Sequence, residues 1–319
     1  MQALRAHSLD GPSALALDDV PDPVAPAENM VRIGVHAAGV GFVDTLVTRG
    51  LYQVRQEPPF IPGMEVAGVV ESAPAHSGLN VGDRVYASLP VGGCAETVWA
   101  AEHLVAPLPG SLTFAQGAAL VVNDHTAHVA LARRARLRPD ESVLVHGAAG
   151  GLGSAAVRIA AALGARVTAV ASTDERRAAA LAAGAQQAYG PDGWLAAVRA
   201  AGGADIIVDP IGGDVFDASL RALAVEGRLL TLGYVSGRIP SAPANRLLLR
   251  NSDVRGVNWL ALIEAQPTLF RSTASGIAAL LAGGMPGPAV VEYDFADGAR
   301  AFADLENRAV VGKAVLRAR

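Results

Sequence analysis

Residues 142–171 read Ser142-Val-Leu-Val-His-Gly-Ala-Ala-Gly-Gly-Leu-Gly-Ser-Ala-Ala-Val-Arg-Ile-Ala-Ala-Ala-Leu-Gly-Ala-Arg-Val-Thr-Ala-Val-Ala171, and they carry the strongest indication of the fold. An apolar run, a glycine-rich turn, a helix with one apolar face and a second apolar run follow in that order. A βαβ unit that binds a dinucleotide has this order, because glycines let the backbone approach a pyrophosphate and the helix N-terminus offers unpaired N–H groups to it. The pattern therefore predicts a parallel sheet with a pyrophosphate at the turn Gly147–Gly153.

The residues after the second strand indicate which dinucleotide is bound. A site for NAD usually has a carboxylate there, which binds the 2′-hydroxyl of the ribose, whereas this chain has Ser172. With Arg176 or Arg177 as the countercharge to a 2′-phosphate, this favours NADPH over NADH. Simpler explanations exist: Ser172 and Glu175 match a helix capping box, and the arginines match a solvated helix face. Asp174 suits either a displaced ribose ligand or the positive end of the helix dipole.

The length predicts two domains, and the composition agrees with a soluble enzyme. The 319 residues exceed one ordinary core, and 51% hydrophobic residues with 35 glycines and 19 prolines suit α/β packing with many turns. A net charge of -4 without a basic block argues against nucleic-acid binding. We find no apolar run of membrane-spanning length and no secretion signal, so we expect no membrane association and a cytoplasmic location. A single cysteine, Cys94, excludes an intrachain disulfide.

The pattern of the chain changes near residue 120. Before it, short β-type runs alternate with turns, which predicts a small β-barrel-like domain; the runs are Met30–Ala37, Met64–Ser72, Arg84–Ala87 and Thr97–Ala100. After it, helices alternate with buried strands, which predicts a doubly wound parallel sheet; the strands are Val143–His146, Arg166–Ala171, Ile206–Asp209, Arg228–Gly233 and Val254–Asn258. A helix and two strands end the chain, at Ser272–Ala282, Ala289–Tyr293 and Lys313–Leu316. We expect domains at 1–120 and 121–262, with 263–319 folding back onto the first.

Short motifs run from end to end of the chain, and their order and spacing are together specific. They are Ala38–Thr45, Pro62–Val69, Val81–Val85, Gly93–Glu96, His146–Gly153, Asp209–Gly213, Arg255–Trp259 and Gly312–Leu316. With them the whole chain resembles the zinc-free medium-chain dehydrogenases/reductases of the NADPH:quinone oxidoreductase (zeta-crystallin-like) group. The resemblance implies an α/β protein with a GroES-like β-barrel catalytic domain, a Rossmann doubly wound parallel-sheet domain and NADPH as cofactor.

The resemblance also predicts that no metal is bound. Zinc alcohol dehydrogenases of this superfamily have a cysteine at the position of Gly41 and a histidine at that of Met64, and neither replacement binds zinc. His125 and His128 lie one helical turn apart, which suits a metal, but no third ligand is near in sequence. Without a Lewis acid the substrate must already be electrophilic, which favours quinones and α,β-unsaturated carbonyls over saturated alcohols.

Site residues follow from the resemblance position by position. The expected cofactor-binding residues are Gly150, Gly151, Leu152, Gly153, Ser172, Arg176, Gly233, Tyr234, Asn258, Trp259 and Arg308. Arg176 matches a basic residue for the 2′-phosphate, and Arg308 an arginine that reaches the adenosine phosphate from the C-terminal segment. Gly233 and Tyr234 end a strand where the nicotinamide half is expected. The expected catalytic residues are Asp44, Tyr52 and Thr126.

Around the substrate the chain departs from the family pattern, because Gly41 stands where quinone reductases usually have asparagine. Asp44 could instead cap the following helix, and Tyr52 could be a packed aromatic residue. Asn123 suits either a hydrogen bond near the nicotinamide or a helix N-cap. Cys94 suits a small packed residue better than a reactive thiol.

We therefore predict a zinc-independent oxidoreductase that transfers hydride from NADPH to a small-molecule quinone or α,β-unsaturated carbonyl. The alternatives are an enoyl-thioester reductase and an NADPH-binding sensor or interaction protein with little turnover. The resemblance also implies a homodimer paired through Val254–Asn258, with Val257 and the leucines of Arg246-Leu-Leu-Leu-Arg250 as apolar contacts. A helix buried within one subunit would explain these leucines equally well.

Overall fold

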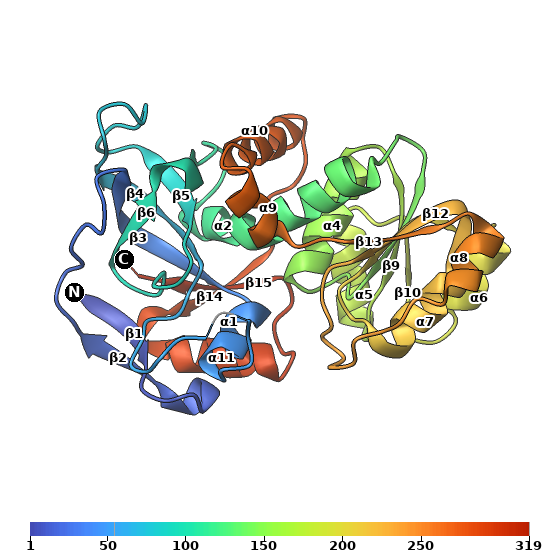
Figure 1. The fold of residues 1–319 in the computed structure, drawn as a ribbon, viewed down its shortest axis with the longest axis horizontal. Helices are drawn as coiled ribbons and strands as arrows, with labels where there is room; N and C mark the ends of the chain where they lie inside the picture. Colours follow the sequence, from blue (N-terminus) through green and yellow to red (C-terminus); the bar gives the residue numbers. More distant parts are fainter. Residues whose placement is uncertain (54, 319) are drawn as a thin grey trace. The chain divides into compact units, whose positions relative to one another are not determined.

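The computed structural model describes residues 1–53 and 55–318, whose contacts divide the chain into two compact units (Figure 1). The first comprises Met1–Val122, Gln266–Ala274 and Gly287–Arg319, and the second comprises Asn123–Ala265 and Ser275–Pro286. Ser275–Pro286, which the sequence placed in the C-terminal return, thus groups with the second unit. Gly276 explains this, because a Cβ there would lie 2.7 Å from the Nε2 atom of His128.

The first unit is built on a seven-stranded sheet. Six strands follow the order β14-β15-β3-β4-β5-β7, and β6 also pairs with β3. Neighbours are antiparallel except for the parallel pair β14–β15. The strands are β3 (Met30–Val40), β4 (Glu65–Ser72), β5 (Arg84–Ser88), β6 (Thr97–Ala101), β7 (Val105–Pro107), β14 (Val290–Asp294) and β15 (Lys313–Arg317). A separate antiparallel pair joins β1 (Gln2–Ala6) and β2 (Leu15–Asp19).

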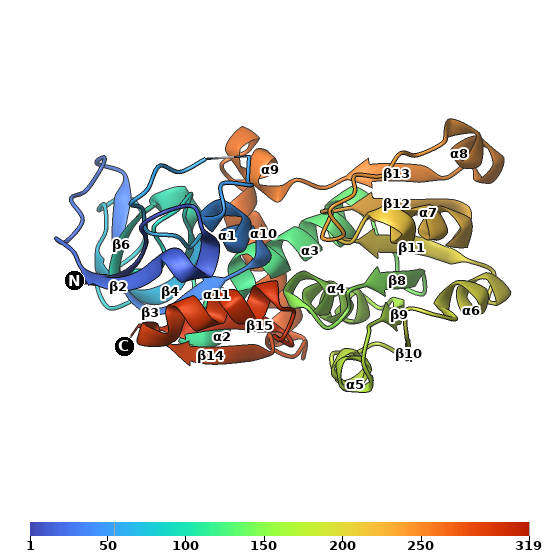
Figure 2. The ribbon, with the colours of Figure 1, turned by 90° about the horizontal axis from the view of Figure 1, so that it is seen from below.

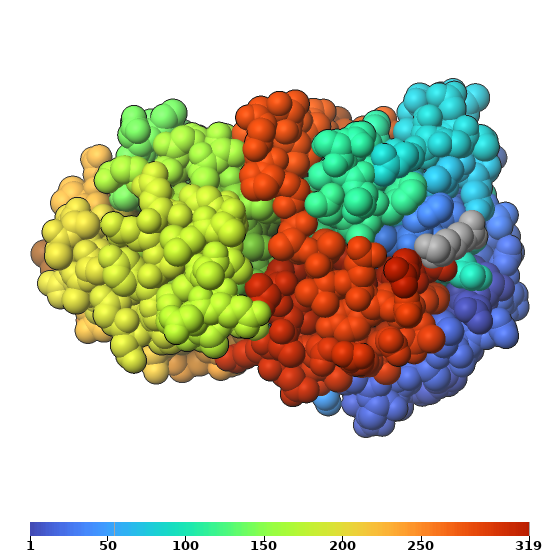
Figure 3. Space-filling model, turned by 180° about the vertical axis from the view of Figure 1, so that it is seen from behind, coloured from blue at the N-terminus to red at the C-terminus, as the bar shows by residue number. Residues whose placement is uncertain are grey.

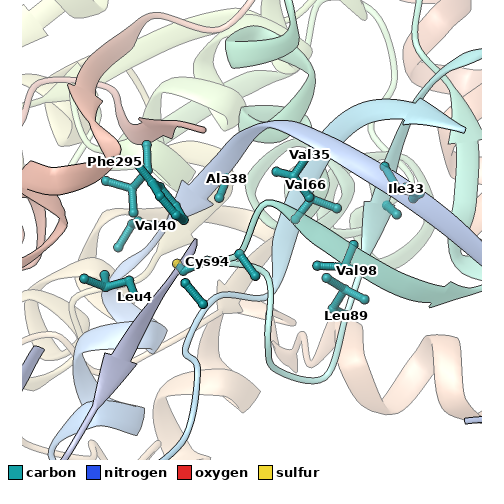
Figure 4. Close-up of a cluster of buried hydrophobic side chains, with 14 of the residues drawn as sticks. Leu4, Ile33, Val35, Ala38, Val40, Val66, Leu89, Cys94, Val98 and Phe295 are labelled. Carbon is teal, nitrogen blue, oxygen red and sulfur yellow. The ribbon is translucent and has the colours of Figure 1, made fainter. Parts of the chain in front are cut away.

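Alternating apolar residues of these strands form the core of the first unit, together with residues from the loops and the C-terminal segment. Figure 4 shows this core, with Leu4, Ile33, Val35, Ala38, Val40, Val66, Leu89, Cys94, Val98 and Phe295 pointing toward one another. The helical elements of this unit are η1 (Gly11–Ala14), α1 (Phe42–Thr48), η2 (Glu102–Leu104), α2 (Phe114–Ala119), η5 (Phe295–Asp297) and α11 (Gly298–Glu306). Arg49, the C-cap residue of α1, forms a bidentate ion pair with Glu306 of α11: Nε donates to Oε1 at 2.6 Å and Nη2 to Oε2 at 2.8 Å.

The second unit contains a six-stranded parallel sheet in the order β10-β9-β8-β11-β12-β13 (Figure 2). Its strands are β8 (Ser142–His146), β9 (Arg166–Val170), β10 (Gln187–Tyr189), β11 (Ala204–Asp209), β12 (Leu223–Thr231) and β13 (Asp253–Gly256). The chain moves outward from β8 through β9 to β10 and then returns to the other side of β8. The strand order therefore reverses between β8 and β11, and ligands of such sheets bind at the carboxyl ends of the strands at this point.

Helices cover both faces of the parallel sheet. The helices of this unit are α3 (His125–His128), α4 (Gly151–Ala162), α5 (Asp174–Ala182), α6 (Trp194–Ala200), α7 (Gly213–Ala222), α8 (Ala244–Arg250) and α9 (Trp259–Ala265), with α10 (Leu269–Ala282) shared between the units and π-helical segments η3 (Leu120–Asp124) and η4 (Val129–Ala135). On one face Trp194 and Phe216 of α6 and α7 pack on Leu144, Ile207 and Leu229. Figure 3 shows, in lime to yellow, surface formed by the α4 to α6 region.

The predicted fold class is confirmed, with small differences at strand ends. Strand β13 stops at Gly256, two residues before its predicted end, and the side chain of Asn258 accepts a hydrogen bond from Ala261 N (3.2 Å) at the start of α9. The three-residue strands β7 and β10 carry too little pattern to be found from sequence. Among the described residues, no helix is long and apolar enough to cross a membrane.

Candidate functional site

The glycine-rich turn joins β8 to α4 in the second unit, and its backbone packs against itself. Gly147 adopts φ +60°, a conformation that favours glycine. At Gly153 a Cβ would lie 2.1 Å from the carbonyl oxygen of Gly147, so only glycine can occupy this position. Gly150 is different, since the nearest atom to a Cβ there would be that same oxygen at 3.5 Å. Gly153 thus serves packing, while the surface beside Gly150 is open to a ligand.

The N-terminus of α4 has the properties that an anion requires. Gly150 is the N-cap residue and supplies no side chain to bond the first N–H groups, and the first turn contains no acidic residue. Those N–H groups and the positive end of the helix dipole therefore suit the pyrophosphate of a dinucleotide. Leu152 lies in the same turn and is half-buried.

The side chain of Asn123 lies close to Gly151 of this turn. A Cβ at Gly151 would fall 2.4 Å from the Nδ2 atom of Asn123, so a side chain at 151 would displace that amide. Asn123 belongs to the π-helical segment Leu120–Asp124 and not to a helix start, which makes its interpretation as an N-cap wrong. Thr126 follows in α3 and is 8% exposed.

A buried ion pair holds the next part of this region. Arg158 Nη2 and Asp124 Oδ1 are 2.6 Å apart, with side chains 4% and 1% exposed, and Arg158 Nη1 donates to the carbonyl of Pro286 at 3.0 Å. This pair was not among the contacts predicted from the sequence. Its signal was an arginine among the apolar residues of the α4 pattern, but the partner lies 34 residues earlier in the chain.

The two histidines of α3 pack within the second unit. His125 is fully buried, and its ring meets Trp259 edge-on with centroids 5.6 Å apart. Burial, with a smaller effect of His128, lowers the pKa of His125 to about 3, so its imidazole is neutral at physiological pH. Trp259, expected beside the cofactor, is 3% exposed and forms part of this packing. Across residues 1–53 and 55–318, we find no group of three or more His, Cys, Asp or Glu side chains placed to hold a metal.

The carboxyl end of β9 carries the candidate 2′-phosphate residues. Thr173 is the N-cap of α5 and accepts a hydrogen bond from Arg176 N at 3.2 Å, so the cap is Thr173 and not Ser172. Arg177 folds back over the strand end: its Nη1 donates to the carbonyls of Ala171 (3.2 Å) and Ser172 (3.3 Å), and its Nη2 pairs with Asp174. The guanidinium of Arg177 thus lies at the strand end, where the resemblance implies Arg176.

The other candidate cofactor residues of the second unit follow β12 and β13. Gly233 lies beside Pro210, whose carbonyl oxygen would be 3.5 Å from a Cβ at 233. Tyr234 is 40% exposed. Asn258 uses its side-chain oxygen to bond Ala261 N, so it acts as a helix cap.

In the first unit, three buried charged side chains surround Gly41. A Cβ at Gly41 would lie 3.1 Å from Lys313 Nζ and 3.6 Å from a carboxylate oxygen of both Asp44 and Glu65. Lys313 pairs with Glu65, whose other oxygen accepts from Val122 N at 2.9 Å. Asp44 accepts from Gly41 N at 2.7 Å, which caps α1 as the sequence allowed.

Two carboxylates and one ammonium share this buried cluster, and that affects Asp44. Burial raises the pKa of Asp44 to about 6; Lys313 opposes the rise, Glu65 adds to it, and backbone bonds from Gly41 and Gly63 oppose it. Its carboxyl group therefore exchanges a proton near neutral pH. Burial, with the charges of Asp44 and Glu65, raises the pKa of the Cys94 thiol well above its usual value, so Cys94 is a packed residue.

Two further expected residues lie in the first unit. Tyr52 is half-buried against its apolar core, as a packed aromatic residue would be. Arg308 follows α11 in an exposed turn at φ 56°.

Comparison with known proteins agrees with this arrangement. Residues 27–130 match the family described as alcohol dehydrogenase GroES-like domain, and residues 151–275 match that described as zinc-binding dehydrogenase. The chain is 38% identical to quinone oxidoreductase-like protein 2 of Bos taurus over 272 residues, which cover 82% of this chain and 77% of that protein.

Solved structures are similar over the whole length. A probable oxidoreductase from Mycobacterium abscessus is 42% identical with a TM-score of 0.92, covering 99% of this chain and 98% of the other. The quinone oxidoreductase from Thermus thermophilus, also solved in complex with NADPH, is 39% identical with a TM-score of 0.87, covering 99% and 100%. The chain belongs to the quinone oxidoreductase group of the medium-chain dehydrogenases/reductases.

Proposed function

We propose that this protein is an NADPH-dependent oxidoreductase that reduces a quinone or an α,β-unsaturated carbonyl without zinc. The observation that carries the proposal is the N-terminus of α4, where no side chain caps the helix and the backbone of Gly150 has open space beside it. This helix end follows β8, where the strand order of the parallel sheet reverses. Bound NADPH supplies a hydride from its nicotinamide ring. The Thermus thermophilus relative, which has been solved with NADPH, supports this choice of cofactor.

The residues of the second unit have separate tasks in this proposal. The turn Gly150–Gly153 binds the pyrophosphate through backbone N–H groups. Ser172, Arg176 and Arg177 recognise the 2′-phosphate at the end of β9, where a carboxylate would repel it. Gly233, Tyr234 and Asn258 line the nicotinamide half, and Arg308 reaches the adenosine phosphate.

The first unit supplies the acceptor side of the reaction. Gly41 and Met64 stand where zinc enzymes of the superfamily have ligands, and the buried ammonium of Lys313 lies beside Gly41 instead. In the proposal Asp44, which is protonated in part near neutral pH, delivers a proton as charge develops on the acceptor oxygen. Tyr52 contacts the substrate. Thr126, which belongs to the second unit, lies near the nicotinamide ring.

An acceptor panel tests the function. Purified protein is given NADPH with quinones, enones and enoyl thioesters, and NADP with saturated alcohols, each with and without a chelator. We expect turnover of quinones or enones that a chelator does not change. Turnover of alcohols alone, or its loss with the chelator, would overturn the proposal. Tight NADPH binding without turnover of any acceptor would identify a sensor instead, and preference for thioesters an enoyl reductase.

A pair of variants connects the activity to the Gly41 cluster. Asp44→Asn should lower kcat at least about tenfold, since the amide cannot supply the proton. Asp83→Asn changes a loop carboxylate of the same unit, which accepts a bond from Asn80 N at 2.8 Å, and should leave kcat unchanged. Equal kcat in both variants would remove Asp44 from the mechanism.

We also propose a homodimer that pairs through β13. This strand lies at the edge of the parallel sheet, and the neighbouring α8 exposes Leu248 and Leu249 by 77% and 79%. The leucines are therefore not buried within one subunit, and a second copy would cover them. Light scattering should show a dimer that Leu248→Lys with Leu249→Lys converts to monomer. Leu181→Lys on α5 is the control, and a wild-type monomer would overturn the proposal.

A further inference from the structure

The carboxylate of Asp209 organises a turn that touches both candidate cofactor loops of the second unit. Asp209 ends β11 and is completely buried. Its Oδ1 atom accepts hydrogen bonds from the backbone N–H of Ile211 at 2.8 Å and of Gly212 at 3.0 Å. These two bonds close the turn Asp209–Gly213 before α7 begins.

On one side this turn supports the glycine-rich turn. A Cβ at Gly147 would lie 3.3 Å from the Cδ1 atom of Ile211 and 3.8 Å from the Cγ atom of Pro210. The backbone of Gly147 therefore rests on these two side chains. Because Gly147 also packs against Gly153 at the start of α4, the Asp209 turn fixes the position of the anion-binding end of that helix.

On its other side the same turn holds the loop after β12. The carbonyl of Pro210 accepts from Val235 N at 3.2 Å, and that of Ile211 accepts from Ser236 N at 3.0 Å. Gly213 N in turn donates to the carbonyl of Arg238 at 3.1 Å. The turn Asp209–Gly213 therefore contacts both the segment that begins at Gly233 and the glycine-rich turn, and it connects the two.

We propose that Asp209 is a positioning residue that sets the spacing between the pyrophosphate turn and the loop for the nicotinamide half. The inference rests on the proposed function, because it requires that a dinucleotide occupies both the turn and the loop. Asp209 touches neither the dinucleotide nor the substrate, and it acts through Pro210 and Ile211. A dinucleotide that spans both loops depends on this spacing, whereas a fragment that ends at the first phosphate does not.

A second observation separates the role of the acceptor atom from that of the charge. Within the described part of the chain, neither Asp209 Oδ2 nor the hydroxyl of Thr231, its register partner on β12, has a hydrogen-bond partner. Burial raises the pKa of Asp209, while the bonds from Gly212 and Ile211 oppose the rise. In Asp209→Asn the side chain keeps the Oδ1 acceptor and has an NH₂ donor in place of the Oδ2 atom. The substitution also removes the buried negative charge. It should therefore preserve the turn.

The test compares binding of NADPH with binding of adenosine 2′,5′-bisphosphate, which lacks the second phosphate and the nicotinamide. Asp209→Ala should raise the Kd of NADPH by at least about tenfold and leave that of the fragment within about twofold. Asp209→Asn should restore NADPH binding to within about threefold of wild type. Asp205→Ala is the matched control, since Asp205 lies at the other end of β11 and accepts bonds from Ser142 N and Oγ, both at 2.7 Å.

Parallel weakening of both ligands, or unchanged NADPH binding by Asp209→Ala, would overturn the inference, because a purely structural role predicts no difference between the ligands. If Asp209→Ala does not fold, Ile211→Ala removes the contact with Gly147 and should produce the same split. NADPH binding by the wild type without turnover would refute only the proposed function. A wild type that does not bind NADPH would overturn both.

Discussion

Arg158 and Asp124 form an ion pair of 2.6 Å whose two side chains are almost completely buried in the second unit. Removing one partner leaves an uncompensated charge, so Arg158→Met and Asp124→Asn should each lower the free energy of unfolding by about 3–5 kcal/mol. Combining Arg158→Met with Asp124→Leu should recover much of the loss. Denaturant titration measures this. Arg300→Ala, which removes an exposed pair with Asp304, serves as the surface control and should change stability little.

Gly150 and Gly153 should respond oppositely to alanine. Gly153→Ala forces a Cβ against the carbonyl of Gly147 and should cost on the order of 3 kcal/mol of stability. Gly150→Ala has space and an allowed φ of -81°, so it should fold normally while its methyl group raises the Kd of NADPH by about tenfold. Thermal unfolding and cofactor titration of both variants check this. The assignment of the turn fails if Gly150→Ala binds NADPH as the wild type does.

The two arginines of α5 should determine the preference for the phosphorylated cofactor. Arg177→Ala and Arg176→Ala should each reduce the ratio of kcat/KM with NADPH to that with NADH by about tenfold, the value of one charge-assisted hydrogen bond. Arg199→Ala on the exposed side of α6 should leave the ratio as it is. An unchanged ratio in either of the first two variants excludes that residue from 2′-phosphate recognition.

Stability should depend on pH through Asp44. Its folded-state pKa is raised from 3.8 to about 6, so between these values the folded protein holds a proton that the unfolded chain has released. Stability from this group is therefore greatest at low pH and falls as pH rises from about 4 to about 6, by roughly 3 kcal/mol. Asp44→Asn should remove this pH dependence, so that its stability relative to that of the wild type increases as the pH rises above 6. Chemical denaturation at several pH values is the measurement, and parallel curves for both proteins would contradict it.

Much of the secondary structure of the second unit could be predicted from local sequence. The period of the apolar residues and the glycines of residues 142–171 predicted β8, α4 and β9, because a parallel strand buried on both faces is apolar throughout and a tight turn needs glycine. The capping residue of α5 was less readable. Both Ser172 and Thr173 can cap a helix, and only the bond from Arg176 N to Thr173 shows which one does.

Residue types at short spacing were enough to predict the longer strands and helices, the glycine-rich turn and the family. Which distant side chains meet depended on the tertiary structure. It brought Lys313 to Glu65 and Gly41, Arg158 to Asp124, and the Asp209 turn to Gly147. These contacts join segments far apart in the chain, and their residues are ordinary in their local context. Burial in the folded chain raises the pKa of Asp44 and of Asp209, and no local sequence pattern predicts this.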